Sequence, residues 1–167
     1  DNKTIQNEII NIGFWPGGDR DGNPFVLPDT TLKVASLLKE TLLKKYVFDL
    51  KKLKRKLTFT GVEDRLIALL STLNKQRVKP DSFDFDFFVS ELKAIKKAVV
   101  KEHHGLYIND ITSLINKTQL FGYHFASLDV RQDSRIHHKV FSRIVESCIE
   151  KNNGIFPNNY NQLNEEA

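Results

Sequence analysis

The 167-residue sequence contains no methionine and only one cysteine. A complete translation product begins with methionine, so its absence even at position 1 predicts that the chain is an internal piece of a longer protein. A single cysteine excludes an internal disulfide and a Cys-x-x-Cys metal site. Cys148 lies among apolar residues at helical spacing, so we expect a small buried residue rather than a nucleophile.

Long apolar runs are also missing. None approaches the roughly 20 residues needed to cross a bilayer, and the first residues lack the basic and then apolar layout of a signal peptide. We therefore expect a cytoplasmic protein without a membrane partner. The composition, 40% hydrophobic and 28% charged, is typical of a globular chain that can bury a core.

Hydrophobic spacing predicts a mainly α-helical chain with about two short strands. The expected helices cover about 28–57, 62–73, 87–103, 109–120 and 134–151, and the expected strands lie at 10–14 and within 121–131. Residues 2–10 could be the last turns of a further helix. Capping side chains are expected from residues 29–31, from Asn109 or Asp110, and from Asp133 or Ser134.

The order of these elements divides one internal segment into four parts. Residues 9–27 form a strand and a glycine-rich loop, 28–120 inserted helices, 121–152 a strand and its following helix, and 153–167 a polar, loose tail. In parallel α/β architectures catalytic groups gather beyond the C-terminal ends of strands, so both strands could lead to one site. Two strands make no stable sheet, so we expect the others to lie outside this chain.

The loop after the first strand reads Phe-Trp-Pro-Gly-Gly-Asp-Arg-Asp-Gly-Asn-Pro over residues 14–24. Its acidic spacing invites comparison with a calcium loop, but glycine stands fourth instead of sixth, and Thr30 stands where the twelfth position needs glutamate. The phosphate-binding patterns GxxxxGK[ST] and GxGxxG are absent. Two interpretations stay open, a tight turn held by Asp-to-backbone hydrogen bonds and a functional loop.

The second strand ends in Ser-Leu-Asp-Val-Arg-Gln-Asp-Ser over residues 127–134. Alternation places Ser127, Asp129 and Arg131 on one side of this strand. Asp129 could orient the forked donors of Arg131 toward a phosphate or a carboxylate. An internal salt bridge between the two residues is the alternative.

The positive charge is concentrated in residues 44–56, on a segment whose leucines keep helical register. A solvated basic face is favoured there over a surface for nucleic acid or acidic lipid, because no aromatic platform interleaves with the lysines. The five histidines are scattered without the spacing of a zinc site.

The two strand-end segments resemble the phosphoenolpyruvate carboxylase family. That family carries Phe-x-Ser-Trp-(Met or Ile)-Gly-Gly-Asp-Arg-Asp-Gly-Asn-Pro, which Trp15 and residues 17–24 match. It also carries Arg-x-Asp-x-Arg-Gln-Glu-Ser-x-x-His, and the matching residues here are Asp129, Arg131, Gln132, Asp133 in place of Glu, Ser134 and His137.

The resemblance implies a tetrameric lyase, a (β/α)8 barrel embedded in helices, that joins phosphoenolpyruvate to bicarbonate with Mg²⁺ or Mn²⁺ and yields oxaloacetate and phosphate. It implies that Arg131 grips the phosphate and that Trp15 forms an apolar wall around carboxyphosphate or carbon dioxide. Arg20 would help to bind substrate, and Asp129 and Gln132 would support the site. The loop itself would be shaped by Gly17, Gly18, Asp19, Asp21 and Asn23.

The sequence departs from the family at Phe14, at Pro16, where a backbone donor is lost, and at Ser127, where a positive charge is lost. It also lacks the family's Thr-Ala-His-Pro-Thr-Glu histidine, Gly-Arg-Gly-Gly loop, catalytic lysine and metal carboxylates. We therefore expect an inactive fragment whose Trp15 and Arg131 approach one cleft. The alternatives are a non-catalytic helical module that binds an acidic partner through 44–56, and an inactive relative of the carboxylase.

Overall fold

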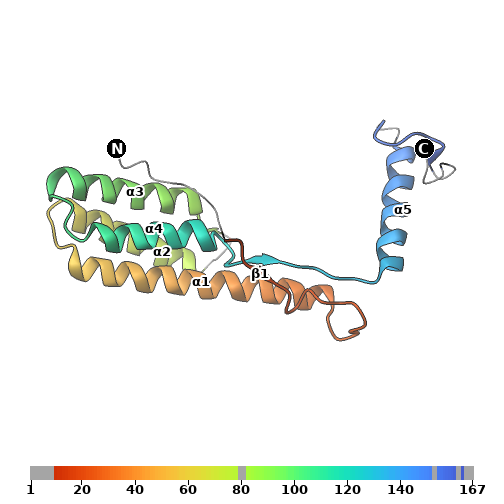
Figure 1. Ribbon diagram of the computed structural model, residues 1–167, viewed down its shortest axis with the longest axis horizontal. Helices are drawn as coiled ribbons and strands as arrows, with labels where there is room; N and C mark the ends of the chain where they lie inside the picture. The colour runs from red at the N-terminus through yellow and green to blue at the C-terminus, as the bar shows by residue number, and fades with distance from the viewer. Residues whose placement is uncertain (1–9, 79–81, 152–153, 161–162, 164–167) are drawn as a thin grey trace.

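Four consecutive helices pack into a bundle, and a fifth stands apart from it in the computed structural model (Figure 1). The structure describes residues 10–78, 82–151, 154–160 and 163, so the helix expected at 2–10 lies outside the described residues except for Ile10, which is not helical. The elements are β1 (Gly13–Phe14), α1 (Pro28–Lys56), α2 (Val62–Val78), α3 (Phe85–Glu102), α4 (Ile108–Phe121), β2 (Ser127–Leu128) and α5 (Ser134–Glu150). The mainly helical prediction with two short strands is confirmed.

The bundle of α1 to α4 is held together by one apolar core. The buried side chains of α1 recur three or four residues apart, which places them on one face of the helix. Phe88 of α3 is fully buried at the centre, with its ring centroid 5.2 Å from that of Tyr46 and 5.8 Å from that of Phe83. The Tyr46 hydroxyl donates a 2.8 Å hydrogen bond to the carbonyl oxygen of Gly122, which ties α1 to the end of α4.

The N-terminal part of α1 extends beyond the other three helices (Figure 1). Its buried residues begin only at Lys39, whereas Leu32 is 67% exposed and Leu37 is 61% exposed. The loop that follows β1 lies alongside this extension. α1 therefore serves both as a wall of the bundle and as the support of the loop.

The helix ends differ in part from the expected caps. Leu27 is the N-cap of α1 and makes no side-chain cap, so the prediction of capping from residues 29–31 is wrong; Pro28, with its fixed φ, begins the helix. Tyr107, in a left-handed conformation, precedes α4, so the cap expected from Asn109 or Asp110 is wrong as well. Asp133 caps α5 by accepting a hydrogen bond from the backbone of Arg135, as predicted.

The two strands pair in parallel, with Gly13 opposite Ser127 and Phe14 opposite Leu128. Both are shorter than predicted. β1 covers only the end of 10–14, and Ile10 is 65% exposed, which corrects the expectation of a buried strand. β2 is short because α4 continues to Phe121 and a turn occupies the residues that follow.

α5 projects away from the bundle, beyond the strand pair (Figure 1). Val145 is buried, and the ring of Phe141 packs against Phe156 and Tyr160, at centroid distances of 6.0 and 6.1 Å. This part of the segment 153–167 therefore contacts α5. Cys148 is half-buried, not a full core residue. Among the described residues, no helix has the length and apolar character required to span a membrane.

Candidate active site

The strand pairing joins the two motif segments, and backbone hydrogen bonds continue it past the strand ends. The nitrogen of Arg131 donates to the carbonyl oxygen of Gly18 at 2.8 Å, and the nitrogen of Arg20 donates to the carbonyl oxygen of Arg131 at 2.9 Å. These bonds surround a parallel bridge between Asp19 and Arg131. Because the strands are parallel, both segments leave them at the same edge.

The first motif begins with a tight turn over Trp15, Pro16, Gly17 and Gly18. The nitrogen of Gly18 donates to the carbonyl oxygen of Trp15 at 2.8 Å, and Gly17 has φ of 82°, as the third position of a type II turn requires. Proline favours the second position of such a turn because its φ is already fixed near the needed value. The N–H that Pro16 lacks takes no part in the bond that closes the turn.

The two glycines of the turn are needed for different reasons. A Cβ on buried Gly18 would lie 2.1 Å from the carbonyl oxygen of Asp129, so only glycine lets the two segments approach this closely. A Cβ on Gly17 would lie 2.6 Å from Cγ2 of Val34, and its φ also disfavours any other residue. The turn therefore lies in direct contact with both β2 and α1.

A single hydroxyl connects the turn, the motif arginine and α1. Nη2 of Arg20 donates to Oγ1 of Thr31 at 2.8 Å, and Oγ1 donates to the carbonyl oxygen of Gly17 at 2.6 Å. Nε of Arg20 is buried without a hydrogen-bond partner. The sequence indicates only a capping role for Thr31 and no role for Val34. Their spacing of three residues, which puts both side chains on one face of α1, is the signal that they could contact the same loop.

The carboxylates of Asp19 and Asp21 do not hold the loop. In the described part of the chain neither side chain makes a hydrogen bond, whereas Oδ1 of Asn23 accepts one of 3.1 Å from the nitrogen of Phe25. The tight turn is present, but Asn23 supplies the side-chain bond to the backbone that was expected from aspartate.

Trp15 and Arg131 both remain open to solvent at this edge. Trp15 is 56% exposed, and Arg131 is exposed with no side-chain partner among the described residues. No ion pair joins Asp129 to Arg131 within those residues; a Cβ on Gly13 would lie 3.1 Å from Oδ2 of Asp129, so this carboxylate lies over β1. The expected orienting contact and the alternative salt bridge are both absent there.

Gln132 and Asp133 lead from the site into α5. Oε1 of Gln132 accepts a 3.1 Å hydrogen bond from the nitrogen of Asp133. Oδ1 of Asp133 accepts from the nitrogen of Arg135 at 2.8 Å. Hydrogen bonds from the Arg135 side chain, and then from its backbone, hold the pKa of the Asp133 carboxyl below its usual range.

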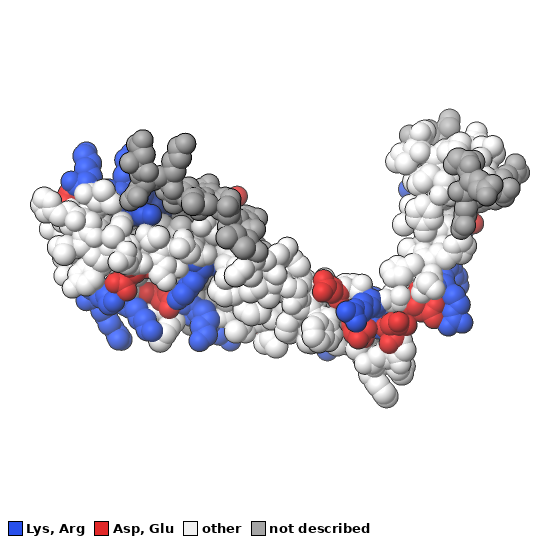
Figure 2. Space-filling view, viewed as in Figure 1, with Lys and Arg blue, Asp and Glu red and all other residues white. Residues whose placement is uncertain are grey.

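Charge of both signs gathers where the bundle meets α5, while lysines and arginines line the edge of the bundle with acidic residues between them (Figure 2). Several of these cations have intramolecular partners. Nζ of Lys56 lies 2.7 Å from Oδ1 of Asp110, and Nζ of Lys117 lies 2.7 Å from Oδ2 of Asp49. The basic segment 44–56 therefore contributes to the contact between α1 and α4.

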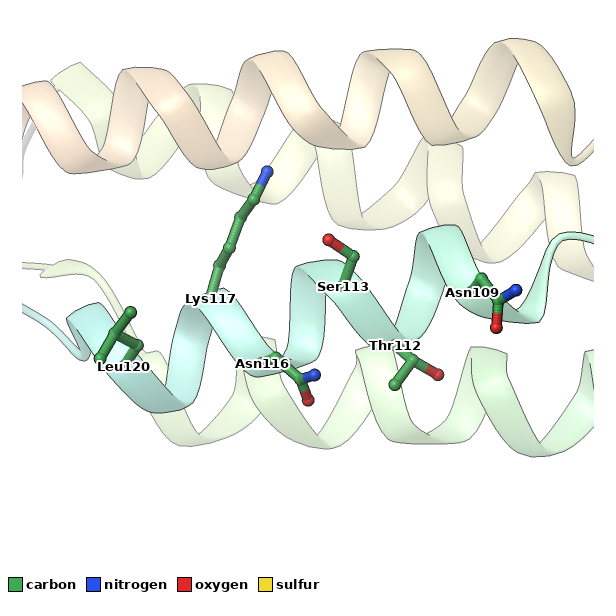
Figure 3. A pocket seen from close by; sticks show the side chains of 6 residues that line it. All are labelled: Asn109, Thr112, Ser113, Asn116, Lys117 and Leu120. Atoms are coloured by element: carbon green, nitrogen blue, oxygen red, sulfur yellow. The ribbon is translucent and has the colours of Figure 1, made fainter. Parts of the chain in front are cut away.

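Three shallow cavities lie away from Trp15 and Arg131. One, of about 340 Å³, covers the outer face of α4, where Lys117 and Ser113 point toward α1 while Asn116 and Thr112 point to the other side (Figure 3). The others lie between α1 and α4 and along α5. Because the side chains on α4 diverge, they form no binding centre. The described residues contain no group of three or more His, Cys, Asp or Glu that could hold a metal ion.

Comparisons with known proteins match the whole chain to one family. The family model described as phosphoenolpyruvate carboxylase matches residues 1–86 and 81–167. The phosphoenolpyruvate carboxylase of Nitrosomonas eutropha is 27% identical, covering 86% of this chain and 20% of its own length. The phosphoenolpyruvate carboxylase of Rhodothermus marinus is 25% identical, over 78% of this chain and 19% of its own length. The phosphoenolpyruvate carboxylase of Rhodopseudomonas palustris strain HaA2 is 23% identical, over 84% of this chain and 19% of its own length.

No solved structure matches the chain. The chain spans about a fifth of the length of the curated relatives that it matches. With both motifs in one paired edge and the family model covering the full sequence, the chain belongs to the phosphoenolpyruvate carboxylase family.

Proposed function

We propose that this chain is an internal segment of a phosphoenolpyruvate carboxylase and carries part of its active site. The parent enzyme joins phosphoenolpyruvate to bicarbonate and yields oxaloacetate and inorganic phosphate. One observation carries the proposal: the two motif segments pair in parallel, so that Trp15 and Arg131 follow neighbouring strands at one edge. Reacting groups gather at such an edge in parallel α/β enzymes.

Arg131 binds the phosphate of phosphoenolpyruvate in this proposal. Its side chain is exposed and has no partner among the described residues, so its donors are available to a phosphate. Asp129 and Gln132 support it through the backbone of the strand end. Arg20 has committed Nη2 to Thr31, so a contact with substrate would come from its Nη1.

Trp15 supplies an apolar wall for the second half of the reaction. Bicarbonate attacks the phosphate, which gives carboxyphosphate and the enolate of pyruvate; carboxyphosphate then releases carbon dioxide, which the enolate captures. Carbon dioxide must not escape between these steps, so the site needs a dry surface beside it. The indole ring provides such a surface because the turn holds it outside the core, where it is 56% exposed.

The remainder of the parent chain covers the apolar surface that this segment leaves open. Phe25 is 85% exposed and Leu32 67% exposed beside the loop, and Val140 and Ile144 are 54% and 51% exposed on α5. In the described part of the chain, β1 and β2 pair only with each other, so each strand also leaves one edge without a partner strand. Further strands of a (β/α)8 barrel would pair with β1 and β2 and complete the cleft around Trp15 and Arg131.

The described residues do not fit a metal site, since they hold no suitable cluster of ligands. Mg²⁺ or Mn²⁺, where the parent uses it, is bound by carboxylates elsewhere in that chain, and no step here depends on it. A cytoplasmic homotetramer, and a segment that is inactive without the rest of the parent, complete the proposal.

The test is an oxaloacetate assay, coupled to malate dehydrogenase, on the full-length parent. The variant Arg131→Ala should lose roughly a hundredfold or more in kcat/KM, because a positioned charge on the phosphate is lost. Arg143→Ala is the matched control, since this arginine is exposed on α5 and pairs with Glu146. Wild-type activity in Arg131→Ala would remove this residue from the phosphate site. A wild-type parent without activity would favour an inactive relative instead, an alternative that Ser127 motivates.

The alternative of a binding module using residues 44–56 gains no specific support. Lys56 is paired with Asp110, and Nζ of Lys52 lies 4.4 Å from the centroid of the Phe48 ring. Such contacts agree with a solvated face that also stabilises the bundle. An affinity for added polyanion that falls with salt would argue for the alternative.

A further inference from the structure

We infer that Thr31 is a positioning residue of the active site: its hydroxyl fixes the turn that carries Trp15 against α1. This inference rests on the proposed function, since it assigns Thr31 to the support of the carbon dioxide wall. The family motif does not include Thr31, which lies beyond its last residue, Pro24.

The hydroxyl of Thr31 donates one hydrogen bond and accepts another, and the direction of each bond is fixed. A hydroxyl has one proton, and here it is donated to the carbonyl oxygen of Gly17 at 2.6 Å. The oxygen then accepts from Nη2 of Arg20 at 2.8 Å, since arginine can only donate. One atom of α1 thus restrains the turn from one side and the arginine of the motif from the other.

An apolar contact one helical turn further along α1 also holds the turn against this helix. Val34 lies three residues after Thr31, on the same face of α1. Its Cγ2 would be 2.6 Å from a Cβ on Gly17, so the backbone of the turn lies directly against the valine methyl groups. The hydroxyl fixes the turn along the helix, and the methyl groups set its distance from the helix.

The restraint reaches Trp15 through the backbone. The carbonyl oxygen of Trp15 accepts the hydrogen bond from Gly18 that closes the turn, so fixing Gly17 fixes the peptide planes on both sides of it. The indole ring is 56% exposed and stacks on no other ring in the described part of the chain. Its orientation therefore depends on the turn more than on side-chain packing.

Loss of the Thr31 hydroxyl leaves the guanidinium donors of Arg20 without a replacement acceptor. Nε of Arg20 is already buried without a partner, and Nη2 would lose its acceptor at the same time. A guanidinium with two unsatisfied donors moves toward water, and it draws the loop away from α1. Valine at position 31 has the shape of threonine without the hydroxyl, whereas serine keeps it.

The experiment compares Thr31→Val with Thr31→Ser and with Thr30→Val. Thr30 is the neighbouring threonine at the start of α1, and its side chain makes no hydrogen bond among the described residues. In the 167-residue chain, Trp15 is the only tryptophan, so its fluorescence anisotropy and its quenching by acrylamide report on the turn. Circular dichroism confirms that the helices of each variant are intact.

In the full-length parent, the same variants are assayed for oxaloacetate, phosphate and pyruvate. Thr31→Val should lower oxaloacetate formation roughly ten- to a hundredfold, the usual effect of a misplaced catalytic surface. It should also raise phosphate released per oxaloacetate above one, because carbon dioxide escapes and the enolate takes a proton to leave as pyruvate. Thr31→Ser should restore both values, and Thr30→Val should match the wild type.

Thr31→Val with unchanged Trp15 fluorescence and an unchanged product ratio would overturn the inference, and so would an effect of equal size in Thr30→Val. A wild-type parent that makes no oxaloacetate would overturn the proposed function instead. In that case, the fluorescence of the three variants still decides whether Thr31 fixes the turn.

Discussion

The carbonyl oxygen of Asp129 occupies the space that a side chain on Gly18 would need, 2.1 Å from the place of its Cβ. This close approach lets the nitrogen of Arg131 reach the carbonyl oxygen of Gly18. The second glycine of the motif is thus explained by the pairing of the two segments, and its φ is not in the left-handed region that only glycine favours.

Gly18→Ala should separate the motif segments while the bundle stays folded. An added methyl group that meets backbone costs about 1–3 kcal/mol, so exchange of the Arg131 amide hydrogen should accelerate roughly five- to a hundredfold. Gly13→Ala is the control, because the φ of Gly13 is not positive and its Cβ would meet only the carboxylate of Asp129, 3.1 Å away, a side-chain end that can move. Equal exchange rates in Gly18→Ala and the wild type would show that the backbone can adapt.

Phe88→Ala should destabilise the chain by about 3–5 kcal/mol, because a fully buried ring leaves a cavity between Tyr46 and Phe83. The adjacent Phe87 is 43% exposed and provides a control with the same chemical change, expected to lose only about 1–2 kcal/mol because much of its ring already lies in water. Urea unfolding followed by circular dichroism measures both. Similar losses in the two variants would contradict this placement of the core.

The effect of Tyr46→Phe on the free energy of unfolding should change sign as pH rises. Below pH 10 the variant should be less stable by about 0.5–1.5 kcal/mol, the contribution of the hydrogen bond to Gly122. Burial raises the pKa of Tyr46 far above its ordinary value. The folded state therefore keeps the phenol protonated while the unfolded state ionises above about pH 10.

The stability that the wild type gains from this phenol is therefore complete below pH 10 and is lost above it, by up to about 1.4 kcal/mol per pH unit. The variant has no such loss, so the two stabilities should meet near pH 11. Urea titrations between pH 8 and pH 11 measure the difference, with Tyr107→Phe, 48% exposed, as the control. A difference that does not change with pH would place the Tyr46 phenol in contact with water.

The helices could be predicted because their signals are local. Apolar residues at helical spacing locate α1, α2 and α3, and Asp133 is a capping residue that needs no tertiary partner. The caps of α1 and α4 were missed because a proline at the first position and a left-handed Tyr107 replace a capping side chain there. The strands were overestimated because an apolar run does not determine how many of its residues find a partner.

The site could be predicted only as residues, not as contacts. The motifs identify Trp15 and Arg131 as candidate site residues. Strand alternation predicts Asp129 beside Arg131, but the Asp129 carboxylate lies over Gly13 instead. The role of Thr31 depends on where a loop folds back onto a helix, which no periodic pattern encodes. Whether Trp15 and Arg131 share one cleft stays a prediction, since both side chains are exposed and the described residues build no walls around them.

The position of the bundle between the two strands has a consequence for the order of folding. β1 precedes α1 and β2 follows α4, so their pairing closes a loop that contains every helix of the bundle. Closing so long a loop in an unfolded chain costs conformational entropy, whereas neighbouring helices meet through short connections. The helices should therefore assemble first and bring the strand ends together. The edge that carries Trp15 and Arg131 would then form last and open first. The folding of the bundle α1 to α4, which contributes no reacting group, would therefore determine when this edge forms.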